Sequence, residues 1–304
     1  MRGAMKVKAS PHRPARIIVL GAERSGTSVV TDMVHCWGAY AGEPEKLTAA
    51  NEHNPQGQWE YNPLWNFLAE LGDFAQGATW WDLAFAERIT AKLQLQEFRG
   101  KALALIADME REKRPWVWKD PALCHFLPFW QPLWGDVAYV ITVRHPYDVA
   151  RSWQRYAVPA HLQASVNLVA CNLLRWQHMI LMVLRATEDV ASKIFVEYEA
   201  LVREPVAQAR RLAAFLDEHC GGAPSVEQSI RAMAARVHPA WWRHHSDRSL
   251  SEIAEATPAQ RRLYGFVRSK LREPGKAFVD AYPMPPGWWE FVHSAEAVIR
   301  AHSQ

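Results

Sequence analysis

The chain has 304 residues, of which 35 are lysine or arginine and 32 are aspartate or glutamate, so its formal net charge is only +3. This balance argues against a dedicated nucleic-acid-binding protein but allows local basic pockets. The cysteines lie far apart and form no C-x-x-C pair, which predicts reduced, mostly buried thiols rather than a disulfide or metal framework; they are Cys36, Cys124, Cys171 and Cys220.

The N-terminal stretch is basic and contains two prolines, and we expect residues 1–15 to form a disordered lead before a single domain at 16–304. The apolar run that follows is only about five residues long, too short for a signal peptide. No apolar stretch approaches the ~20 residues of a membrane-spanning helix. We therefore expect a cytoplasmic protein.

A glycine-containing loop follows the first predicted strand. The apolar run at 16–20 leads into the sequence GAERSGTS at 21–28, and a helical pattern at 29–37 leaves it. A strand, a tight loop and a helix start together form a site for an anion, because backbone N–H groups at the helix N-terminus point at the loop. The loop resembles a Walker A sequence, but Thr27 stands where lysine is expected and the basic residue is Arg24.

The rest of the chain alternates helical and strand patterns. Further helices are predicted at 65–72, 85–113, 148–156, 166–184 and 206–219, and further strands at 116–118, 137–143 and 194–198. Two long irregular segments, about 38–63 and 236–260, are expected to act as lids. The order predicts an α/β fold of the P-loop type, with three layers and a central parallel sheet of about five strands flanked by helices.

Basic residues follow three of the predicted strands. Arg24 lies in the first loop, Lys119 ends the strand that begins at Trp116, and Arg144 follows the apolar run at 137–143. Ligands of open α/β sheets bind outside the carboxyl ends of the strands. We therefore expect the three cations to converge on one crevice.

Four segments resemble the sulfotransferases that use 3′-phosphoadenosine 5′-phosphosulfate (PAPS) as donor. The loop at 21–28 is similar to their 5′-phosphosulfate loop, with its x-x-R-S-G-T-[ST] core, and VRHPYDVARS at 143–152 is similar to their 3′-phosphate motif. WKDP at 118–121 resembles the K-D-P element of the tyrosylprotein and bacterial branches, and VEYEALVREP at 196–205 resembles their Y-E-x-L-x-x-x-P segment. The motifs occur in family order and span residues 16 to about 216.

The resemblance implies a role for each motif residue. The backbone N–H groups of the loop would hold the 5′-phosphate and the sulfate, and Arg24 and Lys119 would stabilise charge on the leaving oxygen. The residues implied to bind the nucleotide are Arg24, Ser25, Gly26, Thr27, Ser28, Arg144, Ser152, Arg155 and Tyr198. The product would be adenosine 3′,5′-bisphosphate, and no metal is expected. The family's glycine-rich late loop is missing, and residues 243–248 stand in its place.

The general base that activates the acceptor hydroxyl is left open by the sequence. Glu60, in GQWE at 57–60, matches a segment of bacterial members, and Glu45 lies at the distance from the loop arginine seen in tyrosylprotein sulfotransferases. These two rank equally, Glu43 follows, and Asp120 comes last. The acceptor is expected to be a hydroxyl of a small molecule, such as a bacterial secondary metabolite, or of a glycan or lipid.

Simpler readings stay open for several residues. Arg144 is spaced to form a helix-start ion pair with Asp148, Lys119 with Asp120 fits a surface ion pair, and Tyr198 fits a core aromatic. Each candidate glutamate fits a solvated loop charge. Two alternatives for the whole protein are a P-loop kinase of small molecules, against which Thr27 counts, and a non-catalytic adenine-nucleotide-binding protein.

Overall fold

The computed structural model describes residues 15–51, 54–74, 96–157, 168–221 and 226–270. Four strands form one sheet in the order β2–β1–β3–β4, and every neighbouring pair is parallel. The strands are β1 (Arg16–Leu20), β2 (Trp116–Lys119), β3 (Ala138–Val143) and β4 (Lys193–Glu197). The expected α/β fold with a central parallel sheet is confirmed. The expected count of about five strands is too high for the described residues, which contain four.

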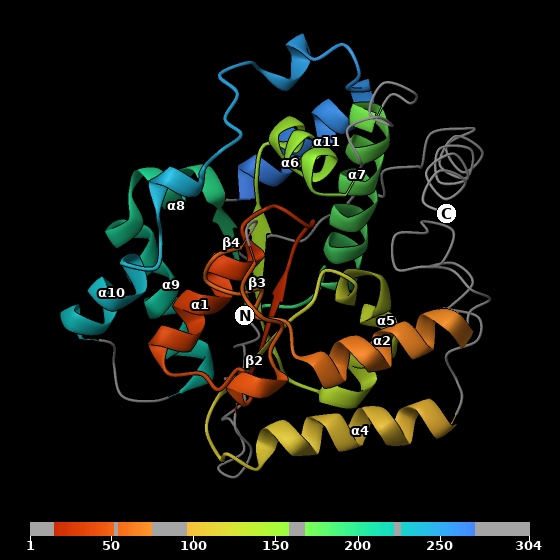
Figure 1. Ribbon diagram of the computed structural model, residues 1–304, viewed down its shortest axis with the longest axis vertical. Coiled ribbons are helices and arrows are strands. Elements are labelled where there is room, and N and C mark those ends of the chain that lie inside the picture. The colour runs from red at the N-terminus through yellow and green to blue at the C-terminus, as the bar shows by residue number, and fades with distance from the viewer. Residues whose placement is uncertain (1–14, 52–53, 75–95, 158–167, 222–225, 271–304) are drawn as a thin grey trace, which may run out of the picture.

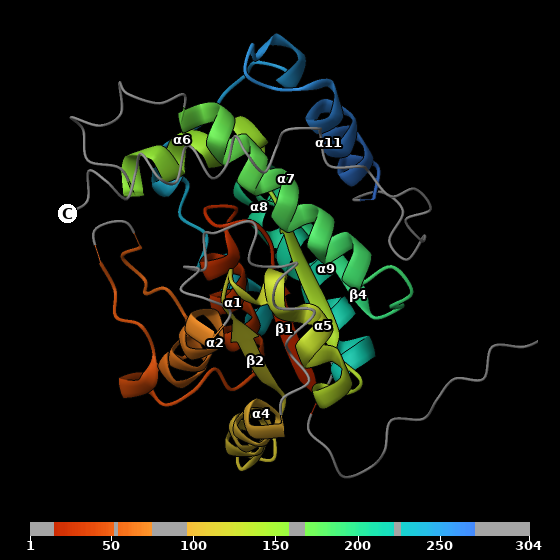
Figure 2. The same cartoon turned by 90° about the vertical axis from the view of Figure 1, so that its right-hand side faces the viewer.

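Helices cover both faces of this sheet, so the molecule has three layers (Figure 1). On one face lie α1 (Thr27–Trp37), α9 (Pro205–Cys220) and α10 (Glu227–Ala234). On the other lie α2 (Asn62–Phe74), α4 (Gln96–Glu110), α5 (Leu123–Trp134) and α7 (Leu168–Ala186). Helix α6 (Pro146–Ala157) and helix α11 (Pro258–Lys270) both pack against α7, as the turned view in Figure 2 also shows.

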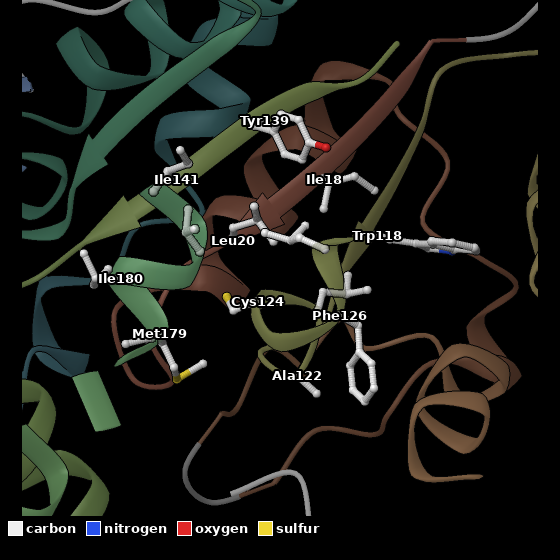
Figure 3. Close-up of a cluster of buried hydrophobic side chains, with 14 of the residues drawn as sticks. Ile18, Leu20, Trp118, Ala122, Cys124, Phe126, Tyr139, Ile141, Met179 and Ile180 are labelled. Carbon is white, nitrogen blue, oxygen red and sulfur yellow. The ribbon is translucent and has the colours of Figure 1, made fainter. Parts of the chain in front are cut away.

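Strand β1 explains why the sequence shows a continuous apolar run rather than an alternating one. Ile17 and Val19 point into the core under α1 and α9, whereas Ile18 and Leu20 point into the core on the opposite face. A strand of a parallel sheet covered on both sides has no solvent-facing positions. Figure 3 shows the second of these cores, in which Ile18 and Leu20 lie among side chains of β2, β3, α5 and α7.

Helix α5 was not predicted, because Pro128 and Pro132 lie inside it and proline normally ends a helix. Its apolar side chains are nearly all buried, including Phe126, Trp130 and Trp134. Tertiary burial therefore outweighs the local cost of the prolines. Helices α10 and α11 are likewise additions to the predicted elements.

The ends of several elements differ from those predicted. The helix expected at 65–72 is longer, as α2, and the helix expected at 85–113 is described only as α4, since 75–95 lie outside the described residues. The strand expected at 194–198 ends one residue earlier, and Tyr198 instead begins helix α8 (Tyr198–Arg203). The expected lead at 1–15 falls almost entirely outside the described residues.

In the described residues of the two expected lid segments, the secondary structure consists of short 3₁₀ turns and isolated β-bridges, apart from the first residues of α2 and α11. These turns are η1 (Pro44–Lys46) in the first segment, and η3 (Pro239–Trp241) and η4 (Leu250–Glu252) in the second. No helix in the described part of the chain is both long and apolar enough to span a bilayer.

Candidate active site

The loop between β1 and α1 has a backbone that its glycines make possible. Gly21, Arg24 and Gly26 have φ angles of 145°, 65° and 94°. A Cβ on Gly26 would lie 2.4 Å from Cδ2 of Tyr198, so this position has no room for a side chain. The loop ends in the N-terminus of α1, whose first N–H groups have no partner within the helix and suit an anion.

A cavity of about 500 Å³ opens in front of this loop at the carboxyl ends of the strands. Each strand end contributes to its wall: Arg24 follows β1, Lys119 ends β2, Arg144 follows β3, and Tyr198 follows β4. Both irregular segments also reach it, through residues 54–60 and through Arg243 and His244. The expected convergence of the three strand-end cations on one crevice is therefore seen in the structure.

The side of the cavity beyond β3 is cationic. Arg24 donates from Nε to Oγ of Ser152 at 3.1 Å. Arg144 donates from Nη1 to the carbonyl oxygen of Arg24 at 2.9 Å and from Nη2 to that of His244 at 2.5 Å. Its guanidinium also lies 4.7 Å from the centre of the Tyr198 ring. Arg144 thus holds the first loop and the late irregular segment together.

Asp148 bonds to the same late segment. It accepts a hydrogen bond at 3.3 Å from the backbone N–H of Ser246. Arg144, the partner expected from a helix-start ion pair, instead donates to the two backbone carbonyls described above. Arg144, which follows β3, and Asp148, in α6, therefore both bind the irregular segment at 243–246.

The side of the cavity beyond β2 contains a buried ion pair. Lys119 donates from Nζ to Oε1 of Glu60 at 2.7 Å and to the carbonyl oxygen of Gln58 at 3.0 Å. The side chains of Lys119 and Glu60 are 3% and 14% exposed. Between the two partners of Lys119, Trp59 has a φ of 61° and its ring centre lies 4.9 Å from that of His35. The alternative reading of Lys119 as the surface partner of Asp120 therefore does not hold, because Lys119 is buried and pairs with Glu60.

Two more buried carboxyl groups lie near this pair. Burial, and then the charge of Glu60, raise the pKa of Asp120 to about 8. Its Oδ1 accepts the Ala122 N–H at 2.8 Å, while Oδ2 has no hydrogen-bond partner among the described residues. Burial also raises the pKa of Glu23, which the Arg175 guanidinium opposes from 3.7 Å away. The cavity therefore holds a lysine among three carboxyl groups.

The comparison with protein families identifies the chain. A profile described as "Sulfotransferase family" matches residues 14–220, more than half of its length. The chain belongs to the sulfotransferase family.

Solved structures of sulfotransferases resemble the chain weakly. The sulfotransferase domain of the Synechococcus PCC 7002 olefin synthase is 18% identical, with 98% of both chains covered and a TM-score of 0.46. The sulfotransferase STF9 from Mycobacterium avium is 16% identical, with 86% of this chain and 77% of that chain covered and a TM-score of 0.47. The sulfotransferase domain from the curacin biosynthetic pathway is 17% identical, with 93% and 98% covered and a TM-score of 0.43. A comparison with curated protein sequences finds no match.

Of the loop residues predicted for the site of this sulfotransferase, Ser25 does not line the cavity. Ser25 donates its hydroxyl to the carbonyl oxygen of Ala22 at 2.6 Å and its N–H to the same oxygen at 3.2 Å, and its Oγ lies 2.7 Å from that of Thr142. Ser25 therefore braces the loop, while Gly26, Thr27 and Ser28 line the cavity. The side chain of Arg155 lies outside the described part of the structure.

The candidate bases separate clearly in space. Glu43 accepts a hydrogen bond from Lys46 at 3.2 Å in the turn η1, and Glu45 is exposed on the same turn. Neither lines the cavity, whereas Glu60 and Asp120 both do.

Sequence reasoning missed Glu23 and its partner Arg175. Arg175 lies in α7, and its guanidinium is 4.3 Å from the centre of the Trp153 ring, which lines the cavity. A signal was available, because Arg175 is the one lysine, arginine, aspartate or glutamate in the otherwise mainly apolar sequence at 168–184. The described residues contain no group of three His, Cys, Asp or Glu side chains placed to hold a metal ion.

Proposed function

We propose that this sulfotransferase moves the sulfuryl group of PAPS to a hydroxyl of a small-molecule, glycan or lipid acceptor, by in-line transfer and with no metal. The observation that carries the proposal is the buried contact between Lys119 and Glu60 in a cavity whose other side is cationic. A cation for the leaving oxygen and a carboxylate for the acceptor proton then lie in direct contact. Transfer chemistry of this kind depends on positioning and charge stabilisation.

The residues of the cavity fit the nucleotide. Nε of Arg144 is buried and has no hydrogen-bond partner among the described residues, so it can donate to a phosphate oxygen. Ser152 and Tyr198 also line the cavity wall, and Gly26 lets the Tyr198 ring pack directly against the loop backbone. A planar guanidinium fork is well suited to phosphate. When bound, PAPS supplies an activated sulfuryl group on a phosphate leaving group.

Each residue of the chain then has a defined task. Arg24 and Lys119 donate to the oxygen on which negative charge develops, an oxyanion-hole type of stabilisation. Glu60 accepts the acceptor's hydroxyl proton at Oε1, the oxygen that Lys119 contacts in the free protein. Engagement of Lys119 by the donor therefore weakens its contact with Glu60 and leaves that carboxylate free to act as a base.

Thermal-shift titration tests the nucleotide class. We expect adenosine 3′,5′-bisphosphate to raise the melting temperature without magnesium, because cationic side chains and backbone N–H groups provide its site. Conversion of PAPS to the bisphosphate in the presence of alcohols provides the activity measurement. Stabilisation by ATP with magnesium but not by the bisphosphate would contradict the proposal and favour a kinase.

A further inference from the structure

The cavity has two chemically different ends, and the strand order explains why. Strand β1 lies between β2 on one side and β3 with β4 on the other. Residues that follow β3 and β4 therefore gather at one end of the cavity, and residues that follow β2 gather at the other. This separation assigns a place to each of the two substrates of the proposed function, on which the inference rests.

The end beyond β3 and β4 collects positive charge. Arg144 stacks on Tyr198, and the charges of Arg144, Arg24 and Arg243 all act to lower the pKa of that tyrosine, against the effect of its burial. Arg24, Arg144 and Arg243 line the same cavity. Phosphate groups belong at this end.

The end beyond β2 combines carboxyl groups with an apolar wall. Glu60 and Asp120 lie there with Lys119, and helix α2 begins at Asn62, two residues after Glu60. Trp65, Leu68 and Ala69 line the cavity from that helix; at spacings of three and four residues they share one face. Leu68 is 3% exposed, whereas Trp65 is 45% exposed although it is a large apolar side chain.

We propose that the acceptor is an alcohol with an apolar body and no negative charge, held with its hydroxyl at Glu60 and its body against Trp65 and Leu68. Apolar contact with Trp65 removes exposed aromatic surface from water, which stabilises binding. An acceptor carboxylate would have to lie beside the carboxyl groups of Glu60 and Asp120, with Lys119 as the nearby cation. Above about pH 8, where Asp120 is ionised, its buried and unpartnered Oδ2 offers such an anion no hydrogen bond.

The behaviour of Asp120 agrees with this assignment. Burial, and then the charge of Glu60, raise the pKa of Asp120, and both causes act against any further negative charge at this end of the cavity. The same electrostatic cost applies to a carboxylate brought in by an acceptor. Neutral alcohols avoid it.

Acceptors matched in skeleton and different in charge provide the test. The pairs are 1-octanol with 8-hydroxyoctanoate, and 2-naphthol with 6-hydroxy-2-naphthoate, with glucose as a polar neutral acceptor. In the PAPS assay we expect kcat/KM at least about tenfold higher for each neutral alcohol than for its carboxylate, and higher than for glucose, since a buried charge or polar body costs at least one factor of ten. Equal or better turnover of the hydroxy acids or of glucose overturns the proposal, as does no transfer to either neutral alcohol.

Variants locate the acceptor site. Trp65→Ala is expected to raise KM for 2-naphthol by about tenfold while the melting-temperature shift caused by the bisphosphate stays unchanged. The matched control is Leu103→Ala in α4, an apolar side chain that is 43% exposed and does not line the cavity. An unchanged KM in Trp65→Ala overturns the placement.

A second variant tests the role of charge. Asp120→Asn keeps an oxygen for the Ala122 N–H and removes the ionisable group, so above about pH 8, where Asp120 is charged, it should narrow the difference in kcat/KM between 2-naphthol and its carboxylate. If this variant leaves the difference in kcat/KM unchanged, the proposed electrostatic exclusion of acidic acceptors is wrong. If the unmodified protein does not bind the bisphosphate at all, that result contradicts the proposed function itself and not only the proposed acceptor.

Discussion

Lys119 and Glu60 contact each other at 2.7 Å inside the cavity, although they lie 59 positions apart in the chain. The lysine ends a central strand, whereas the glutamate lies in a long irregular segment. Each neutralises the other where both side chains are largely buried, so removing one leaves a buried, unpaired charge. The pair is therefore both a structural contact and the centre of the proposed chemistry.

Lys119→Ala should reduce sulfuryl transfer by about 10²–10³-fold, because it removes a cation that stabilises the leaving oxygen. Bisphosphate binding should be largely retained, since Arg144 and the loop remain. Steady-state rates and thermal-shift titration measure the two effects. Lys101→Ala in α4 is the control, because this lysine pairs with Glu70 on the surface. Turnover of Lys119→Ala close to that of the unmodified protein would exclude the catalytic role.

Glu60→Gln should lower kcat by about 10²–10⁴-fold, since the amide cannot accept a proton. Its amide oxygen can still accept the Lys119 hydrogen bond, so the fold should be kept. Glu43→Gln and Glu45→Gln are the matched controls, and both should leave kcat nearly unchanged because these side chains lie outside the cavity. A large loss of kcat in either control, together with an active Glu60→Gln variant, would indicate that the general base lies in the turn η1.

Gly26→Ala should abolish the bisphosphate-induced shift and lower the melting temperature. Its φ of 94° is unfavourable for alanine, and the new Cβ would lie 2.4 Å from Tyr198. Gly100→Ala in α4 is the opposite control: its Cβ would meet no atom within 4 Å, so we expect it to stabilise the helix by about 0.5–1 kcal/mol. Normal nucleotide binding by Gly26→Ala would show that the loop backbone differs from the one described.

His125 should make the protein less stable in acid. Burial lowers the pKa of His125 from 6.5 to about 3 in the folded protein. Its contribution is therefore present above about pH 6.5 and is lost as the pH falls toward 3, with a cost on the order of 2 kcal/mol at pH 5. Denaturant unfolding between pH 7 and 5 measures this loss.

His125→Phe provides the comparison that isolates this effect. Phenylalanine keeps a ring beside His178, whose ring centre lies 5.2 Å away, and should reduce the loss of stability on acidification. The comparison is needed because the raised pKa of Asp120 acts in the opposite sense: its contribution is present below about pH 3.8 and is lost as the pH rises toward 8. If the free energy of unfolding falls equally between pH 7 and 5 in His125→Phe and in the unmodified protein, the prediction is wrong.

Local sequence patterns were sufficient to predict the strands, the loop and the cations that surround the site. The strand at 16–20, its glycine loop and helix α1 could be predicted because continuous apolar residues, glycines and helical spacing act within a few residues of each other. Arg24, Lys119 and Arg144 could be placed together because parallel strands present their carboxyl ends at one edge. The family assignment was also predictable, since its motifs are short and in order.

Contacts between segments that are distant in the chain could not be predicted from local sequence patterns. The sequence left Glu43, Glu45 and Glu60 open as bases, and only the packing of Leu64, Phe67 and the rest of α2 against the sheet brings Glu60 to Lys119. Helix α5 with its two prolines exists because burial of its aromatic side chains outweighs the proline cost. The sequence by itself therefore determined the family, the strand ends and the cations. The tertiary structure alone decided which carboxyl groups share the cavity, because that depends on side chains packing across the fold.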